Sequence, residues 1–330
     1  MKIRIIVLIF ILVLAMIGFV SAIDITECQT LDIEGATYIL QNDIITNEYA
    51  CFEIAGNNIV LDLNGYSITA NSSGEFGVLI HGFNSATIKN GVINDFDEGV
   101  YIEDSSDNNL LDLNINNGAY GVFLERATST QINNATISNS HLYDLGADDL
   151  DTEEQCNHSL INVVGSNDKP IAFYNDAVNI NNLDLSEMIL CNADNSNINN
   201  ITINNDVNNR NGVLMFNTDN AYLNEISVIK GYLGFFMLNS HNNIINDSNF
   251  IGSEREGMRI FSGNANEILN SDISNNGLEG IELNDARNNS FISNFIEYNG
   301  HGHGGISIED DDDLGGNLFY NNFFNNNYNI

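Results

Sequence analysis

The chain has 330 residues, 43% of them apolar and 17% charged, so it has enough apolar material for a large core and is not composed like a disordered protein. Its ten basic residues stand against 45 acidic ones, which gives a formal charge of −35. A charge of this sign and size repels nucleic acid and anionic lipid, and it disfavours the binding of polyuronates unless multivalent cations take part.

The first 22 residues have the composition of a secretory signal peptide. Lys2 and Arg4 precede an apolar run from Ile5 to Val20, and small residues follow the run. We expect cleavage after Ala22; the alternative is an uncleaved membrane anchor, although sixteen apolar residues fall slightly short of the about 20 that span a bilayer. In both cases the remaining chain is exported to the cell surface or the extracellular space. Without the signal it carries a formal charge of −37, because the signal holds two basic residues and no acidic one.

Four cysteines in an exported chain predict disulfides rather than free thiols. We expect Cys28 to pair with Cys51 and Cys156 with Cys191, the simplest of the three connectivities. None of the four lies in a C-x-x-C pair, so a zinc site is not predicted. Residues 23–52 contain the first pair but lack the repeating unit described next, and they are predicted to form a disulfide-bonded cap over the N-terminal end of the core.

A glycine, an alternating apolar strand and a polar turn recur about every 22 residues. The glycines that begin these units are Gly77, Gly99, Gly121, Gly212, Gly234, Gly257, Gly280 and Gly305. Their spacings are 22, 22, 91, 22, 23, 23 and 25, and 91 corresponds to about four further units. A fixed period in this range indicates a solenoid.

Apolar residues occupy the same places in the units that begin at Gly77 to Gly280, and the unit at Gly305 keeps only the first two of these places. They stand one, three, eleven and sixteen positions after the glycine, as in Val100, Ile102, Leu110 and Ile115. Strands have a period of two, so these columns are predicted to face inward. Three short strands per unit and a single proline in the chain predict an all-β fold, a right-handed parallel β-helix with three short parallel sheets. Ten to twelve coils spaced at about 4.8 Å would form one rod of roughly 50–55 Å.

Asparagines recur eight or nine residues after the glycine, at Asn108, Asn220, Asn242 and Asn288. We expect them in turns that need a positive φ, stacked into amide ladders. Regular coils are predicted over 53–140 and 194–330. Residues 141–193 break the pattern with the acidic stretch LGADDLDTEEQCNH, Pro170 and the second cysteine pair, and they are predicted to form an acidic, disulfide-bonded excursion from the rod.

The stretch ECQTLDIEGATYILQNDI, followed by CFEIAGNNIVLDLNGYSI and ATIKNGVI, resembles exported β-helix proteins of the pectin-lyase-like superfamily. It is most similar to the NosD-like group, the carbohydrate-binding and sugar-hydrolase (CASH) modules found on archaeal surfaces, and DKPIAFYNDAVNI resembles the segment that joins two β-helix stretches in that group. The resemblance implies the fold and an extracellular carbohydrate role. NosD proteins are associated with copper supply, but this chain contains no cysteine- or methionine-rich copper motif.

Catalytic motifs of related β-helix enzymes match only in fragments. Polygalacturonase-like hydrolases carry the motifs N-T-D, D-D, G-H-G and R-I-K in this order. This chain contains NTD at 217–219, RIF at 259–261 and GHG at 300–302. The order of the last two is reversed, and the paired aspartates are missing. YNGHGHGG at 298–305 resembles only half of a C5-epimerase pattern. Arg259, Glu282 and His301 are the candidate catalytic residues, because they would meet at one end of the coils. The alternative is a plain surface salt bridge between Arg259 and Glu282.

The second residue after each glycine is predicted to face outward. This row reads Leu79, Tyr101, Phe123, Leu214, Phe236, Arg259, Glu282 and Ser307. An exposed apolar row is unusual, so we interpret Tyr101, Phe123 and Phe236 as a stacking surface for sugar rings. The alternative is that residues 141–193 or a second copy of the chain cover this row.

No cofactor is firmly predicted, although calcium is a candidate. His301, His303, Asp310, Asp311, Asp312 and Asp313 are candidate metal ligands. Carboxylates suit calcium and imidazoles suit transition metals, and a solvated acidic turn is the alternative.

Six Asn-x-Ser/Thr sequons permit glycosylation, at Asn71, Asn134, Asn157, Asn200, Asn246 and Asn288. The sequence leaves three functions open. The favoured hypothesis is a non-catalytic exported β-helix that binds glycan or builds a surface layer with other proteins. The others are a polysaccharide lyase, C5-epimerase or glycoside hydrolase, and an adhesion module that uses the C-terminal edge. Membrane contact is expected only through an uncleaved signal.

Overall fold

The computed structural model describes residues 22–71, 74–150, 152–206, 210–300, 304–309 and 315–326. The predicted signal peptide, apart from Ala22, lies outside these ranges. The described chain is a right-handed parallel β-helix with two short 3₁₀ helices, at Glu153–Cys156 and Ser166–Asp168. Across these ranges no helix reaches the length and apolar character that a membrane span requires.

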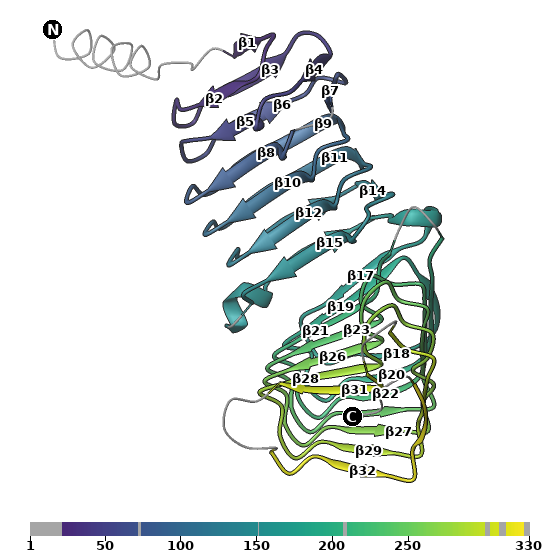
Figure 1. The fold of residues 1–330 in the computed structure, drawn as a ribbon. Helices are drawn as coiled ribbons and strands as arrows, with labels where there is room; N and C mark the ends of the chain where they lie inside the picture. The colour runs from purple at the N-terminus through teal and green to yellow at the C-terminus, as the bar shows by residue number, and fades with distance from the viewer. Residues whose placement is uncertain are drawn as a thin grey trace, which may run out of the picture.

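The first half of the coils forms one stack, which we call the first stack (Figure 1). Its inner sheet contains β2 (Gln29–Leu31), β5 (Ala50–Ile54), β8 (Phe76–His81), β10 (Glu98–Glu103), β12 (Tyr120–Glu125) and β15 (Tyr143–Asp148). Its outer sheet contains β1 (Ile23–Ile25), β3 (Thr37–Leu40), β4 (Ile44–Thr46), β6 (Val60–Asp62), β7 (Ser67–Ala70), β9 (Thr87–Asn94), β11 (Asn109–Asn116), β13 (Gln131–Asn133), β14 (Thr136–Ser138) and β16 (Ser159–Ile161).

The remaining coils form the second stack. Its inner sheet contains β17 (Ile171–Tyr174), β19 (Glu187–Cys191), β21 (Val213–Phe216), β23 (Phe235–Leu238), β26 (Met258–Phe261), β28 (Ile281–Asn284) and β31 (Ile306–Glu309). Its outer sheet contains β18 (Asn179–Leu185), β20 (Asn197–Asn204), β22 (Tyr222–Ile229), β24 (Ile244–Asn246), β25 (Asn249–Ile251), β27 (Glu267–Leu269), β29 (Ser290–Ile292) and β32 (Leu318–Tyr320). β30 (Phe295–Glu297) pairs with β33 (Phe323–Asn325).

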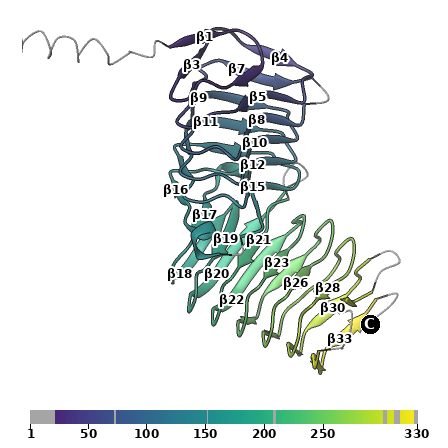
Figure 2. The same ribbon diagram turned by 90° about the vertical axis from the view of Figure 1, so that its left-hand side faces the viewer.

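The two stacks do not form one straight rod, which corrects the expectation from the sequence. Figure 2 shows the second stack turned away from the axis of the first, with both inner sheets on the inside of the bend. We call this junction the elbow. A buried disulfide between Cys156 and Cys191 spans it, and a second disulfide joins Cys28 to Cys51 in the first coils. Both pairs are those expected from the sequence.

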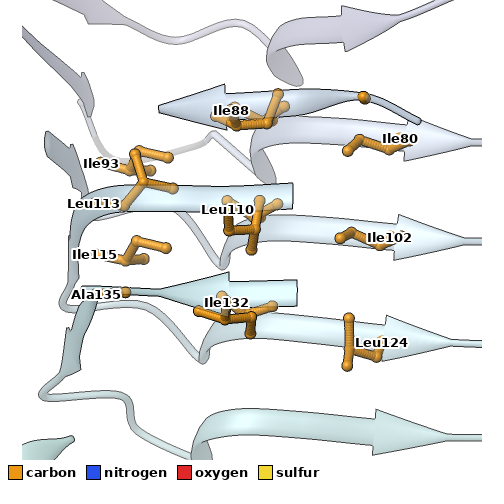
Figure 3. Close-up of a cluster of buried hydrophobic side chains, with 14 of the residues drawn as sticks. Ile80, Ile88, Ile93, Ile102, Leu110, Leu113, Ile115, Leu124, Ile132 and Ala135 are labelled. Carbon is orange, nitrogen blue, oxygen red and sulfur yellow. The ribbon is translucent and has the colours of Figure 1, made fainter. Parts of the chain in front are cut away.

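The core confirms the predicted inward columns. Ile80, Ile102 and Leu124 from one column face Ile88, Leu110 and Ile132 from another across the coil, and all six are fully buried (Figure 3). The second and third predicted strands of a coil run together as one strand in β9, β11, β20 and β22, and they remain separate in other coils, as β24 and β25 do.

The glycine that begins each coil has a packing reason. A Cβ on Gly77 would stand 2.5 Å from the carbonyl oxygen of Gly99, and a Cβ on Gly99 would stand 2.5 Å from that of Gly121. Directly stacked coils therefore leave no space for a side chain at this position. In the strand register Asp144 lies opposite Gly121. Ile171 and Glu187 occupy the equivalent position in the two coils that precede the coil of Gly212. These are the units missing from the 91-residue interval.

Residues 141–193 are not an excursion, because their strands belong to the sheets. β15 and β16 complete the first stack, and β17, β18 and β19 begin the second. Residues 23–52 likewise supply β1 to β4 and most of β5, so the predicted cap is the first coil of the sheets. The sequence of these coils does not show the repeat because they lack its glycine and vary in length.

The asparagine ladders lie one residue further along than expected. Asn220, Asn242 and Asn288 do adopt positive φ, of 57°, 56° and 55°. The amide ladder, however, consists of the residues that follow such turns, Asn243, Asn266, Asn289 and Asn317, whose side chains bond to one another at 3.1 to 3.2 Å. Asn108 belongs to this second position: it is fully buried and accepts a hydrogen bond from the backbone N–H of Ala86. The amide groups of Asn243, Asn266 and Asn289 are stable in the interior because each bonds to the next coil, whereas the Nδ2 of Asn108 has no hydrogen-bond partner among the described residues.

Candidate functional site

The elbow contains a cavity of about 250 Å³ to which both stacks contribute. The first inner sheet supplies Tyr120, Phe123, Tyr143, Ala147 and Asp148. The second stack supplies Leu214, Tyr232, Leu233, Phe236, Arg255 and Arg259. The outward row predicted from the sequence enters this cavity from both sides, because Phe123 belongs to one stack and Phe236 and Arg259 to the other.

Aromatic rings form a continuous run along the first inner sheet towards this cavity. Tyr49 meets Phe76 at 5.2 Å, Phe76 stacks on Tyr101 at 5.0 Å, and Tyr101 stacks on Phe123 at 5.7 Å with an interplanar angle of 9°. Tyr101 therefore has a ring against each of its faces, and it offers a ligand its edge. Its hydroxyl also donates to Glu125. The expected stacking surface at Tyr101 is thus occupied by its own neighbours.

The aromatic row reaches the cavity at a glycine. Phe123 stands beside Gly146 in the register, and the rings of Phe123 and Tyr120 occupy the space that a side chain on Gly146 would need. Tyr120 packs against Phe123 at 4.5 Å with its plane tilted by 50°, so the two rings lean over Gly146 and line the cavity. Burial raises the pKa of Tyr120 to about 12, so its hydroxyl remains a hydrogen-bond donor at any physiological pH.

The second stack closes the cavity with aromatic and basic side chains. Tyr232 meets Tyr143 at 6.1 Å, and the guanidinium of Arg255 lies 5.9 Å from the centre of the Tyr232 ring, within range of a cation–π contact. Arg259 donates to the Glu282 carboxylate at 2.7 and 2.9 Å and lies 3.2 Å from Glu256. Burial raises the pKa of Glu256, although Arg259 and Arg255 oppose the shift.

Glu98 is a half-buried carboxyl group on the same aromatic surface. In the register it stands between Phe76 and Tyr120. Burial, with smaller contributions from the negative charges of Asp97 and Glu75, raises the pKa of Glu98 to about 7. One of its carboxylate oxygens is buried without a hydrogen-bond partner among the described residues. Glu98 can therefore gain or lose a proton near neutral pH beside a ligand on this surface.

Two fully buried acidic residues hold the floor of the elbow together. The carboxylate of Asp144 accepts hydrogen bonds from Ser166 and Ser186 hydroxyls, both at 2.9 Å, and from the Asn211 amide at 2.6 Å. Glu187 accepts from the backbone N–H of Leu145 at 2.9 Å. Burial, and then the charge of Asp144, raise the pKa of Glu187 well above its usual range.

Within the described part of the chain, two groups of acidic and histidine side chains are close enough to hold a cation, but both already face an arginine. His81, Glu103 and Asp104 form one group, in which Arg126 binds Glu103 and Asp104. Glu256, Glu279 and Glu282 form the other, beside Arg259. Because the guanidinium groups already neutralise these carboxylates, neither arrangement favours calcium.

The structure brings some of the predicted site residues together. Arg259 and Glu282 form the ion pair that their register implies, and Phe123, Phe236 and Arg259 meet at the cavity. Leu214, predicted to face solvent, is only 3% exposed because the first stack packs over it. His301, His303, Asp310, Asp311, Asp312 and Asp313 lie outside the described residues.

Three residues that the sequence analysis does not identify share one position, directly before the glycine of their coil, while Tyr232 and Arg255 stand two residues before theirs. Glu98, Tyr120 and Glu256 precede Gly99, Gly121 and Gly257. Glu98 and Tyr120 are the first residues of β10 and β12, so these strands begin one residue before the glycine. The column before the glycine carries the signal, since it mixes acidic and aromatic residues where the inward columns are uniformly apolar.

Comparison with known proteins supports the fold. Residues 187–330 match the family model described as a right handed beta helix region. No curated protein sequence matches the chain.

Among solved structures, the chain is similar to the periplasmic alginate epimerase AlgG, at 14% identity over 88% of this chain and 77% of that one, with a TM-score of 0.37. It is similar to an alginate lyase from Paenibacillus, at 12% identity over 94% of this chain and 99% of that one, with a TM-score of 0.34. It is also similar to the catalytic unit of an α-1,3-glucanase from Streptomyces thermodiastaticus, at 11% identity over 92% and 62% of the two chains, with a TM-score of 0.38. At these values the likeness carries no conclusion on activity.

Proposed function

We propose that this protein is an exported, non-catalytic β-helix module that binds an extracellular glycan at the elbow. The observation that carries the proposal is the cavity that Phe123 and Tyr120 of the first stack line together with Phe236 and Tyr232 of the second, with Arg255 at the edge. Sugar rings present flat C–H faces and hydroxyl groups together. A site of aromatic rings with a few polar groups at its rim matches that mixture.

The export and family parts of this proposal rest on other features. Two disulfides favour a compartment outside the cytoplasm, and the N-terminal 22 residues have the pattern of a signal. The sequence resemblance to the NosD-like and CASH group on archaeal surfaces supports a carbohydrate role at the cell surface. Binding to surface-layer proteins would use the same exported state but a different face.

Catalysis is less well supported by the geometry of the elbow. A hydrolase needs two carboxyl groups with separate roles across the bond that breaks. Glu256 and Glu282 are the acidic residues beside Arg259, and both are engaged by the same guanidinium group. A lyase or epimerase that uses Arg259 as a base would have to remove a proton from a residue that two carboxylates keep charged.

Affinity electrophoresis in gels that contain laminarin, mannan, dextran, amylose, alginate or polygalacturonate tests the proposal. We expect one of these polysaccharides to retard the protein, and Phe123→Ala and Phe236→Ala to abolish the retardation. Tyr222→Ala is the matched control, because Tyr222 is an exposed ring on the second outer sheet. Retardation that survives both cavity variants, or robust release of reducing or unsaturated ends that Glu282→Gln abolishes, would contradict the proposal.

A further inference from the structure

The shape of the elbow limits how a glycan can lie in it. The aromatic row follows the first inner sheet from Phe76 through Tyr101 to Phe123, roughly along the axis of the first stack. At the elbow the second stack rises across this direction (Figure 2). Its contribution there is a wall of packed side chains, since Leu214 and Leu233 are buried and Tyr232 meets Tyr143 at 6.1 Å.

The available ring surface is also confined to this corner. Along the row each ring covers the face of the next, as at Tyr101, which has Phe76 at 5.0 Å and Phe123 at 5.7 Å. Only past Phe123, where Gly146 follows in the register, does the row present ring surface to a cavity. A sugar ring can therefore stack at the elbow but not at successive places along the row.

The cavity is small. Its volume of about 250 Å³ lies below the roughly 300–1,000 Å³ of pockets that enclose drug-sized molecules. It has room for the last sugar of a chain but not for a long internal segment that turns through the corner. The wall also carries a hydrogen-bond donor suited to a terminal hydroxyl group, because the side chain of Arg255 is 37% exposed and its contacts with Tyr232 and Glu256 are long, at 3.5 Å each.

We propose that the elbow recognises the end of a glycan chain, with Phe123 and Tyr120 stacking the terminal sugar and Tyr232 and Arg255 forming the wall that stops it. This inference rests on the proposed glycan binding and specifies which part of the glycan is bound. A chain that continued in both directions would meet the wall of the second stack. The chain end adds a hydroxyl group that an internal sugar lacks, and the guanidinium of Arg255 is placed to donate a hydrogen bond to its oxygen.

The test uses the full-length mature protein and the six polysaccharides named above, each both intact and shortened about tenfold by partial acid hydrolysis. Binding is measured at equal concentrations of sugar monomer. End recognition predicts that the shortened preparation reaches half-saturation at about one tenth of the monomer concentration, because it contains ten times as many ends. Half-saturation that is unchanged or weaker per monomer would overturn end recognition and leave glycan binding intact. Absence of binding to every preparation would contradict the proposed function itself.

A variant separates the wall from the stacking surface. Tyr232→Ala removes the ring that closes the cavity and should reduce the tenfold preference for shortened chains to less than threefold, while the protein still binds. Tyr222→Ala, on the outer sheet, should keep the full preference. Thermal unfolding of both variants shows whether the fold is preserved, and a Tyr232→Phe variant that restores the preference excludes an effect of misfolding. A preference that Tyr232→Ala leaves unchanged would contradict the assigned wall.

Discussion

The regular coils and the elbow use one position of the repeat in opposite ways. In the regular coils Gly77, Gly99 and Gly121 lie directly against the backbone of the next coil, and any side chain would collide with it. At the elbow the same position holds Asp144 and Glu187, which are fully buried and bonded to both stacks. A straight solenoid has no room for a side chain at this position. The bend creates space there, and the polar groups that fill this buried space need hydrogen-bond partners.

The comparison also explains why the functional site lies where it does. Regular coils cover one another's outward side chains, so the aromatic row of the first stack is closed along its length. The elbow interrupts the stacking and leaves a cavity where side chains from two stacks face each other. In this molecule the departure from the repeat, and not the repeat, provides the concave surface on which a ligand can bind.

Removal of the carboxylate at the elbow should have the largest effect. Asp144→Ala leaves the Ser166, Ser186 and Asn211 donors buried without their common acceptor. We expect the free energy of unfolding to fall by about 4 kcal/mol, since breaking a buried charged network costs about 3–5 kcal/mol. Urea unfolding followed by circular dichroism measures it. Asp144→Asn keeps one acceptor oxygen and should lose clearly less; equal losses would show that the hydrogen bonds are not the cause.

Addition of one methyl group in a regular coil should have the next largest effect. Gly99→Ala places a Cβ against Ile115 and 2.5 Å from the Gly121 carbonyl oxygen, which belongs to a backbone that pairs on both sides. We expect a loss of about 3 kcal/mol, at the upper end of the cost of overpacking a core. The same urea experiment detects it. A loss below 1 kcal/mol would mean that adjacent coils can move apart, and the distinction between coil and elbow would then fail.

Much of the regular part could be predicted from the sequence, and the elbow could not. Val100, Ile102, Leu110 and Ile115 follow Gly99 at fixed offsets, and this pattern predicts strands and core because it needs only local alternation. The elbow coils depart from the period: the positions of Asp144, Ile171 and Glu187 are 27 and 16 residues apart. Only the pairing of strands in space aligns them with a glycine.

The cavity residues show the same limit. Phe123 and Phe236 could be recognised as outward from the repeat, but their approach depends on the angle between the stacks. That angle follows from how Leu214, Ile189 and Phe216 pack against the first stack, and no periodic pattern encodes it. The faces of Tyr101 were also misjudged, because one row of a solenoid stacks its rings on each other.

The titration of Glu187 should make the stability of the elbow depend on pH. Its pKa is raised in the folded protein by burial and by Asp144, so the folded state holds a proton that the unfolded state releases above the ordinary carboxyl range. The contribution of Glu187 to the free energy of unfolding is therefore greatest at low pH. It falls as the pH rises towards the pKa of Glu187 in the folded protein, by up to about 1.4 kcal/mol per pH unit.

Comparison of wild type with Glu187→Gln, by urea unfolding between pH 5 and 9, isolates this contribution. The glutamine variant keeps the carbonyl oxygen that accepts from Leu145 but cannot ionise, so it should become more stable than wild type as pH rises. Parallel curves over the whole range would contradict the assignment. Gly99, the equivalent position in a regular coil, carries no titrating group, so the effect belongs to the elbow alone.

Glu98 lies in a regular coil and should affect ligand binding rather than the joint between the stacks. Its pKa is raised to about 7, first by burial beside Phe76 and Tyr120 and then by Asp97 and Glu75. A glycan that covers this surface removes water from the carboxyl group of Glu98. The free-energy cost of this desolvation is larger when the carboxyl group is charged. Affinity should therefore be higher at pH 6 than at pH 8, by a few-fold, because Glu98 loses its proton across this range.

Two substitutions and one control identify the titrating group behind this last effect. Glu98→Gln should remove the pH dependence, and Glu75→Gln should move its midpoint to lower pH, since one negative charge that raises the Glu98 pKa is gone. His81 is another ionisable side chain of this sheet, but it lies at the opposite end of β8 from Phe76, where it is bonded to Glu103 at 2.6 Å. His81→Asn should therefore leave the profile unchanged. If His81→Asn flattens the profile and Glu98→Gln does not, the proton belongs to the polar edge around Arg126, and the aromatic surface binds its ligand without regard to pH.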